Sequence, residues 1–464
     1  MTEQIGSTRT SRRQLLRAGG ATALAAGLGP AALAACGGSG DAGGDSGRLT
    51  FMYWGSAFEK KAIDEMLKQY AGEHKGTKVD PMYVPVANYP TKVSSLVAAN
   101  TPPDLAYLGT AQMYDLAQKG LILNLFPYLD KYPALKDRLP SSYFWYGKDK
   151  LAANQLAMGV QILYYNTDAF KAAGLDAAPF TAATAWSWDD FVQAADKLTV
   201  DQNGKHPSED GFDAGQVKQF GTIAPFGSAP LYSLLRSNGA DMVNADGTKF
   251  ALDSAAAIDV LKKVQDLIYV HRVAPTPAQL GKNAPTTAVQ LQTKRVGMVI
   301  DGNWQMLDLM EGKVPFGVAV LPKFQEPLTM TGGAAGVIFA KTKHPEQAIE
   351  LYLYYNDPEH VDLFKDGLWA PLQKKYYTEQ SEIDKWVLKD QYPPNFRTAV
   401  VDTTLKNGVT DWGQQIKNAE RIHQVLDPAI EQISLNKGAP VDIVKALKPK
   451  MQALLQGKWP SQAL

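Results

Sequence analysis

The 464-residue chain has almost no cysteine: only one, Cys36, is present. No disulfide can form within the chain, so the fold must be stabilised by its apolar core. Lysine plus arginine and aspartate plus glutamate balance at 47 each. A neutral chain lacks the basic face that nucleic-acid phosphates require. These absences exclude a disulfide scaffold and argue against a nucleic-acid partner.

The motifs of metal and nucleophile chemistry are also missing. The six histidines are scattered, with no His-Glu-x-x-His pattern and no cysteine partner. No Gly-x-Ser-x-Gly elbow and no phosphate-binding P-loop is present. We therefore expect no metal, no cofactor and no enzyme. A surface-attached, oligosaccharide-degrading enzyme stays open as an alternative, because it needs only two facing carboxylates and no pair stands out among so many acids.

The first 35 residues have the pattern of an export signal. Arg12 and Arg13 precede Leu15-Leu16 and an Ala/Gly/Leu-rich segment over residues 18–35. That segment has too few large apolar side chains to span a bilayer stably. The paired arginines resemble the twin-arginine signal, which exports chains that fold before they cross the membrane. We predict that residues 1–35 are a signal peptide.

The signal ends in Leu33-Ala34-Ala35-Cys36, which resembles the bacterial lipobox. In that motif the cysteine becomes the new N-terminus and carries a lipid. The alternative, a thiol buried in the core, is disfavoured by the glycine-rich residues 37–40 that follow. We predict that residues 36–47 form a flexible tether. The protein would then be extracytoplasmic and anchored to the outer face of the cell membrane by lipidated Cys36.

Strand-like and helix-like segments alternate after the tether. The apolar pattern predicts strands over 48–55, 77–86 and 103–109 and helices over 58–74 and 89–100. This alternation is typical of an α/β fold with a parallel sheet covered on both faces. Ligands of such sheets bind at the carboxyl ends of the strands, here residues 54–58 and 109–112.

Further segments continue the α/β pattern towards the C-terminus. Ser187 is expected to cap a helix whose first turn carries two aspartates. The tail from 359 to 455 has a mostly helical pattern. The predicted strands cover 156–166, 295–300, 316–321 and 337–340, and the predicted helices 167–173, 188–198, 232–238, 255–269 and 345–355.

The order of these segments resembles the extracellular solute-binding proteins, family 1, of carbohydrate ABC transporters. One departure is Gly159, which stands where that family often has a proline. The resemblance rests on the lipobox and on Tyr53-Trp54-Gly55, Pro103-Asp104, Leu163-Tyr164-Tyr165-Asn166 with the helix after it, Trp186-Ser187-Trp188-Asp189-Asp190-Phe191, residues 235–240, residues 296–304, residues 316–322, Gly332-Gly333 and residues 343–348.

The resemblance implies a two-lobed, type II periplasmic-binding-protein-like fold, with a mostly parallel sheet flanked by helices in each lobe and hinge strands between lobes. The hinge crossings would lie near 159–163, 316–321 and 356–358. Lobe 1 would comprise 48–160 plus 317–355, and lobe 2 would comprise 161–316 plus 356–464. The chain would be a monomer that captures a sugar between its lobes and delivers it to the permease of an ABC importer.

A second ligand class stays open for the same fold. A non-sugar such as a glycerol phosphodiester could occupy the cleft, and its phosphate would need basic residues there.

A sugar presents flat C–H patches and a rim of hydroxyls, so its site needs aromatic faces and hydrogen-bonding groups. Trp304, directly after Asn303, matches the family's sugar-stacking tryptophan. Trp54 ends the first predicted strand, and Thr110 and Gln112 follow the third. The remaining candidates are Tyr232, Gly333, Trp369 and Trp412. For most of these residues a core or purely structural role is the alternative.

Overall fold

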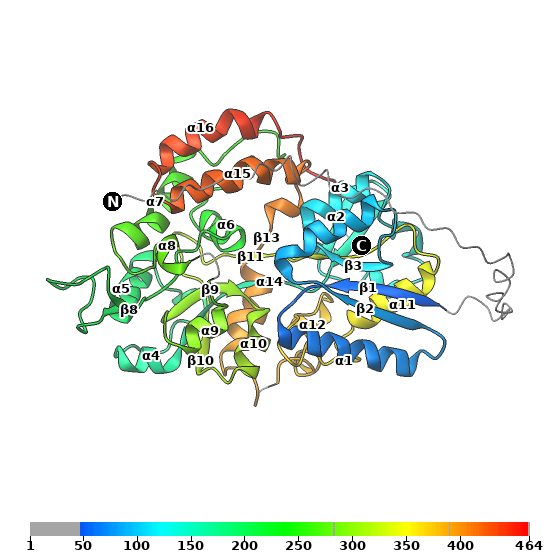
Figure 1. The fold of residues 1–464 in the computed structure, drawn as a ribbon, viewed down its shortest axis with the longest axis horizontal. Coiled ribbons are helices and arrows are strands. Elements are labelled where there is room, and N and C mark those ends of the chain that lie inside the picture. Colours follow the sequence, from blue (N-terminus) through cyan, green and yellow to red (C-terminus); the bar gives the residue numbers. More distant parts are fainter. Residues whose placement is uncertain (1–46, 282–283, 389, 463–464) are drawn as a thin grey trace, which may run out of the picture. The chain divides into compact units, whose positions relative to one another are not determined.

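The computed structural model describes residues 47–281, 284–388 and 390–462. The predicted signal peptide and Cys36 lie outside the described residues. Two main sheets organise the described chain, and they lie apart in Figure 1. The six-stranded sheet has the order β2-β1-β3-β12-β5-β4, formed by β1 Arg48–Tyr53, β2 Lys78–Tyr83, β3 Leu105–Leu108, β4 Tyr143–Gly147, β5 Lys150–Gln155 and β12 Ala335–Ile338. The three-stranded sheet has the order β10-β6-β9, formed by β6 Gln161–Asn166, β9 Met298–Gly302 and β10 Phe316–Ala319.

The two-lobed α/β fold expected from the sequence is confirmed, but neither main sheet is mostly parallel. In the six-stranded sheet only β1 pairs in parallel, with β2 and with β3, and β12, β5 and β4 pair antiparallel. The three-stranded sheet is antiparallel throughout. Two consecutive strands that pair in parallel must be joined by a crossover connection, usually a helix. β12 is reached by a different path, because the chain comes to it from the three-stranded sheet, and it is therefore free to enter in the antiparallel direction.

The remaining strands form two small sheets. β11 Thr329–Thr331 pairs in parallel with β13 Gly408–Thr410, and both lie between the main sheets in the view of Figure 1. β7 Val200–Asp201 pairs with β8 Val217–Gln219 at the base of the polar segment between them.

Helix α1 Ala57–Glu73 explains how the sequence builds the first helical layer. Ser56 caps its N-terminus by accepting a hydrogen bond from the Glu59 N–H (3.1 Å). Its buried residues, from Ile63 to Tyr70, recur at helical spacing and face the first sheet. The other longer helices are α2 Tyr89–Ala98, α3 Thr110–Gln118, α5 Trp188–Leu198, α6 Ser228–Ser237, α7 Ala255–Tyr269, α10 Gln305–Glu311, α11 Pro345–Tyr355, α15 Ala419–Ser434 and α16 Pro440–Gln452.

One exposed position in α1 offers a test of this helix. At Gly72, no described atom lies within 4 Å of the place where a Cβ would stand. Alanine there removes the conformational freedom that glycine has in the unfolded chain. We expect Gly72→Ala to raise the free energy of unfolding by about 0.5–1 kcal/mol. Urea unfolding of both proteins measures the change, and a lower stability of the variant would contradict an open helical position at residue 72.

The chain passes between the sheets more than once. It leaves the first sheet after Gln155 and enters β6 at Gln161. β10 pairs with β6, so the return to the first sheet falls between Ala319 and Ala335, an interval that overlaps the predicted crossing near 316–321.

The tail also contributes to both cores. Buried residues between 361 and 401 join the cluster that contains the six-stranded sheet, and those between 412 and 451 join the second cluster. The predicted division into lobes, including residues 356–464 as part of lobe 2, stays a prediction.

Candidate functional site

A cavity of about 250 Å³ brings together five of the predicted site residues, and we call it the tryptophan cavity. They come from segments far apart in the sequence: the end of β1, the end of β9, the loop before β12 and the tail. The predicted residues in its wall are Trp54, Asn303, Trp304, Gly333 and Trp369, and the others are Glu59, Leu156, Ala157, Met158, Gly159, Ala334 and Leu368. The wall is therefore mostly apolar and aromatic, as a pocket for a flat, hydroxyl-rimmed ligand should be.

Trp304 lies at the junction of β9 and α10, and 40% of its surface is exposed. Its ring rests on bare backbone: a Cβ on Gly302 would stand 2.2 Å from the ring atom Cη2, and one on Gly159 would stand 3.1 Å from Cζ3. The two glycines thus make the space that the indole occupies. A large aromatic ring that stays accessible in a cavity wall can stack on a ligand.

Asn303 fixes the backbone beside Trp304. The Val160 N–H donates to Asn303 Oδ1 (2.9 Å), and the Asn303 N–H donates to the Val160 carbonyl (3.0 Å). These bonds tie the end of β9 to the chain just before β6. The side-chain oxygen of Asn303 is therefore engaged in positioning the cavity wall, and its predicted ligand contact stays a prediction.

Trp54 and Trp369 flank the buried ring of Tyr107. Trp54 meets Tyr89 and Tyr107 edge-on, at centroid distances of 4.7 Å and 5.3 Å. Trp369 is 4% exposed and lies 6.4 Å from Tyr107 and 5.8 Å from Phe364. These contacts fix both indoles before a ligand arrives, which lowers the entropic cost of binding.

Glu59 is a lining residue that the sequence did not reveal. Burial raises the pKa of Glu59 to about 8, and the nearby Asp308 carboxylate adds to the increase. The carboxyl group therefore keeps its proton at neutral pH and can both donate and accept a hydrogen bond. In the sequence, Ser56-Ala57-Phe58-Glu59 has only the pattern of a helix cap, which indicates no contact with a ligand.

The raised pKa predicts a pH dependence of stability. Between its ordinary value of 4.5 and about 8, Glu59 is protonated in the folded chain and ionised in the unfolded chain. The wild type should thus lose stability relative to Glu59→Gln as the pH rises through this window, and the difference should be flat below it. Urea unfolding of both proteins at pH 4, 6 and 8 measures this. A difference that does not change with pH would contradict the assignment.

A second cavity of about 810 Å³ shares Trp54 with the first, and we call it the acidic chamber. Thr110 and Gln112 lie in its wall, as do Asp115, Asp411, Glu420, His423 and Asp427. Gln112 Nε2 donates to the Pro90 carbonyl and to Ser94 Oγ, both at 3.3 Å. Among the described residues, no lysine or arginine lines either cavity. The basic residues that a phosphodiester would need are thus missing from the described part of both walls.

Two predicted residues line neither cavity. Tyr232 is 3% exposed within α6, and burial raises its pKa. Trp412 is 2% exposed, with its ring 5.4 Å from that of His423. Both pack in the second core cluster, and neither side chain reaches the walls of the two cavities. The structure therefore favours the core role for both residues over the predicted contact with a ligand.

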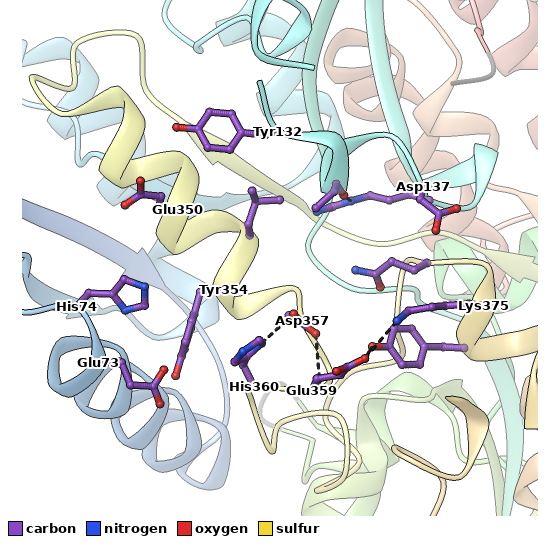
Figure 2. A pocket seen from close by; sticks show the side chains of 15 residues that line it. Glu73, His74, Tyr132, Asp137, Glu350, Tyr354, Asp357, Glu359, His360 and Lys375 are labelled. Carbon is purple, nitrogen blue, oxygen red and sulfur yellow. Dashed lines mark hydrogen bonds and ion pairs between the residues drawn. The ribbon is translucent and has the colours of Figure 1, made fainter. Parts of the chain in front are cut away.

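A third cavity of about 740 Å³, which we call the outer cavity, contains none of the predicted residues. Figure 2 shows its side chains, which come from the end of α1, from α11 and from the segments around 132–138 and 357–376. Several are paired with one another: His360 with Asp357 at 2.8 Å and Lys375 with Glu359 at 3.2 Å. The tryptophan cavity is the better candidate for ligand binding.

In the part of the chain that the structure describes, no group of three or more His, Cys, Asp or Glu residues is placed to hold a metal ion. Over the same residues no helix has the length and apolarity to cross a bilayer.

The fold and the cavity define a binding protein, and comparison with known families agrees. Residues 54–361 match the family described as bacterial extracellular solute-binding protein. The chain belongs to this family.

Three relatives illustrate the likeness. A Brucella abortus protein named as a binding protein is 24% identical over 441 residues, which cover 93% of this chain and 98% of that protein. The arabinooligosaccharide-binding protein of Halalkalibacterium halodurans is 25% identical over 60% of this chain and 59% of its own length. An ABC substrate-binding protein of Listeria monocytogenes, solved in complex with cycloalternan, superposes with a TM-score of 0.74 at 21% identity, over 88% of this chain and 99% of that one.

Proposed function

We propose that this chain captures a sugar or oligosaccharide outside the cell and delivers it to the permease of an ABC importer. The observation that carries the proposal is the meeting of Trp54, Trp304 and Trp369 on one cavity beside the ends of β1 and β9. Indole faces match the C–H patches of a sugar ring. The oligosaccharide ligands in the names of the Listeria and Halalkalibacterium relatives support the same class.

The mechanism is closure of two lobes on the ligand. Ser56 at the start of α1 donates a hydrogen bond to Asp308 Oδ1 of α10 (2.7 Å), which links the helix that carries Glu59 to the helix that follows Trp304. A sugar stacked on Trp304 and touching Trp54 contacts residues that follow β9 of one main sheet and β1 of the other at once. It therefore favours the closed state by contacts that only this state makes. Thr110 and Gln112 would bond hydroxyls further out.

The remaining parts of the proposal follow from the sequence. Cys36 carries a lipid that holds the receptor at the outer face of the cell membrane, and the receptor acts as a monomer. The chain binds its sugar without cleaving it. Release of shortened oligosaccharides by the purified protein would contradict this last point and favour the hydrolase alternative.

Thermal-shift screening against mono- and oligosaccharides, with glycerol phosphodiesters included, tests the proposed function. A ligand that binds only the folded chain raises the melting temperature by mass action. We expect at least one sugar to raise it and the phosphodiesters to leave it unchanged. A shift with phosphodiesters alone would overturn the sugar assignment.

A further inference from the structure

The tryptophan cavity offers few polar groups to a ligand. Of its twelve lining residues, only Glu59 and Asn303 carry a polar side chain other than an indole N–H. Asn303 Oδ1 already accepts a hydrogen bond from the Val160 N–H (2.9 Å). Glu59 keeps its proton at neutral pH because burial raises its pKa to about 8, so the described part of the wall carries no charge. A ligand in this cavity is therefore enclosed mainly by aromatic rings, apolar side chains and bare backbone.

The backbone of the same wall is partly occupied as well, because its segments bond to each other and to the tail. The N–H groups of Leu156, Met158 and Gly332 donate to the carbonyls of Ala334, Ala370 and Gly159, at 2.7, 2.9 and 2.9 Å. The Leu156 carbonyl accepts a further hydrogen bond from Asn356 Nδ2 (2.9 Å). An N–H that is bonded in this way has no proton left for a ligand. These main-chain groups therefore do not make up for the shortage of polar side chains.

The size of the cavity limits what it can enclose. At about 250 Å³ it is smaller than the usual range of about 300–1,000 Å³ for small-molecule sites, so it takes a single sugar ring. The rest of an oligosaccharide would extend past Trp54 towards Thr110 and Gln112, in the wall of the acidic chamber. A hydroxyl group that is enclosed with the ring and left without a partner lowers the affinity by about five- to a hundredfold. Each hydroxyl on the enclosed ring thus weakens binding unless one of the few polar groups reaches it.

On this geometry, and resting on the proposed function, we propose that the ring held at the three tryptophans is a pentose or a deoxyhexose. Such a ring carries a hydrogen or a methyl group where a hexose carries a hydroxymethyl group. It therefore lacks a hydroxyl that this wall is poorly equipped to pair. A methyl group at the same position gains affinity instead, because it packs against the apolar side chains of Leu156, Met158 and Leu368. The receptor selects its sugar by the hydroxyl that would stay unpaired as well as by the shape of the ring.

The test compares sugars that differ only at the hydroxymethyl position. Xylose oligomers are titrated calorimetrically beside glucose oligomers of the same linkage and length, L-arabinose beside D-galactose, and methyl L-fucoside beside methyl L-galactoside. We expect the tightest ligand of the series to lack the hydroxymethyl group and to bind at least about tenfold more tightly than its partner. A tightest ligand that carries the group, or a smaller difference within its pair, overturns the selection but leaves sugar binding intact. Failure of every sugar overturns the proposed function as well.

Two variants add a hydroxyl group to residues of the wall. Ala157→Ser and Ala334→Ser each change a partly exposed alanine that lines the tryptophan cavity. A serine hydroxyl can pair with a hydroxymethyl group, so we expect the affinity ratio within the best pair to fall at least about threefold in one of them. Ala134→Ser, in the outer cavity, is the matched control and should keep the wild-type ratio. An unchanged ratio in both cavity variants, or an equal change in the control, would overturn the role of the wall. The wild-type ligand pairs decide the question even if a variant fails to fold.

Discussion

Trp304→Ala is expected to weaken sugar binding at least about 30-fold while the protein stays folded. Truncating a central aromatic anchor of a binding site costs about 2 kcal/mol or more, and each 1.4 kcal/mol is a factor of about ten. The indole is 40% exposed without ligand, so the fold depends little on it. Titration of the best sugar from the screen measures the affinity, and the melting temperature without ligand measures the fold.

Phe180→Ala is the matched control for this variant. Phe180 is 39% exposed, close to the exposure of Trp304, and lines neither the tryptophan cavity nor the acidic chamber. Its loss should leave sugar affinity unchanged. If Trp304→Ala binds as tightly as Phe180→Ala, the stacking role of Trp304 is wrong.

Gly159→Ala is expected to damage both binding and stability. The added Cβ would stand 2.0 Å from the Gly332 carbonyl oxygen and 3.1 Å from Cζ3 of Trp304. The first contact is with backbone, which cannot rotate away, so the segments around 159 and 332 must separate. Overpacking of this kind typically costs about 1–3 kcal/mol. When these segments separate, the Trp304 ring also moves from its position against Gly159. We therefore expect the sugar affinity to fall more than tenfold.

Gly109→Ala separates this effect from the general cost of replacing a glycine. Gly109 lies in the wall of the acidic chamber and has φ −61°, and no described atom lies within 4 Å of the position that its Cβ would take. This variant should keep nearly wild-type stability and binding. Urea unfolding and sugar titration on both variants decide the matter: similar behaviour of the two would show that residues 159 and 332 separate at little cost.

Local features were predictable because they depend on neighbouring residues. Helix α5 covers 188–198 as predicted, and Ser187 caps it in a reciprocal arrangement with Asp190. The pairing of strands was harder to predict from the sequence. That β12 lies antiparallel between β3 and β5 depends on the path by which the chain returns from the other sheet, and the apolar pattern of one strand does not encode its partners.

The same difference between local and long-range information applies to the candidate site. Trp54 and Trp304 could be selected because they end predicted strands, and strand ends meet at one edge of a sheet. Trp412 could not be placed, because an aromatic residue in a helical tail can face a cavity or a core and its spacing does not distinguish them. Glu59 and Asp411 were missed because their position depends on walls built by segments far away in the chain.

The parallel pairing of β11 with β13 has a consequence for how the chain folds. It joins residues 329–331 to 408–410, and buried residues between 361 and 401 complete the first core. Contacts of such long sequence separation form slowly, and during synthesis they must wait for late segments to emerge from the ribosome. A chain that stops before residue 408 leaves β11 without this partner. We therefore expect that an N-terminal fragment ending before residue 408 does not reach the native fold by itself.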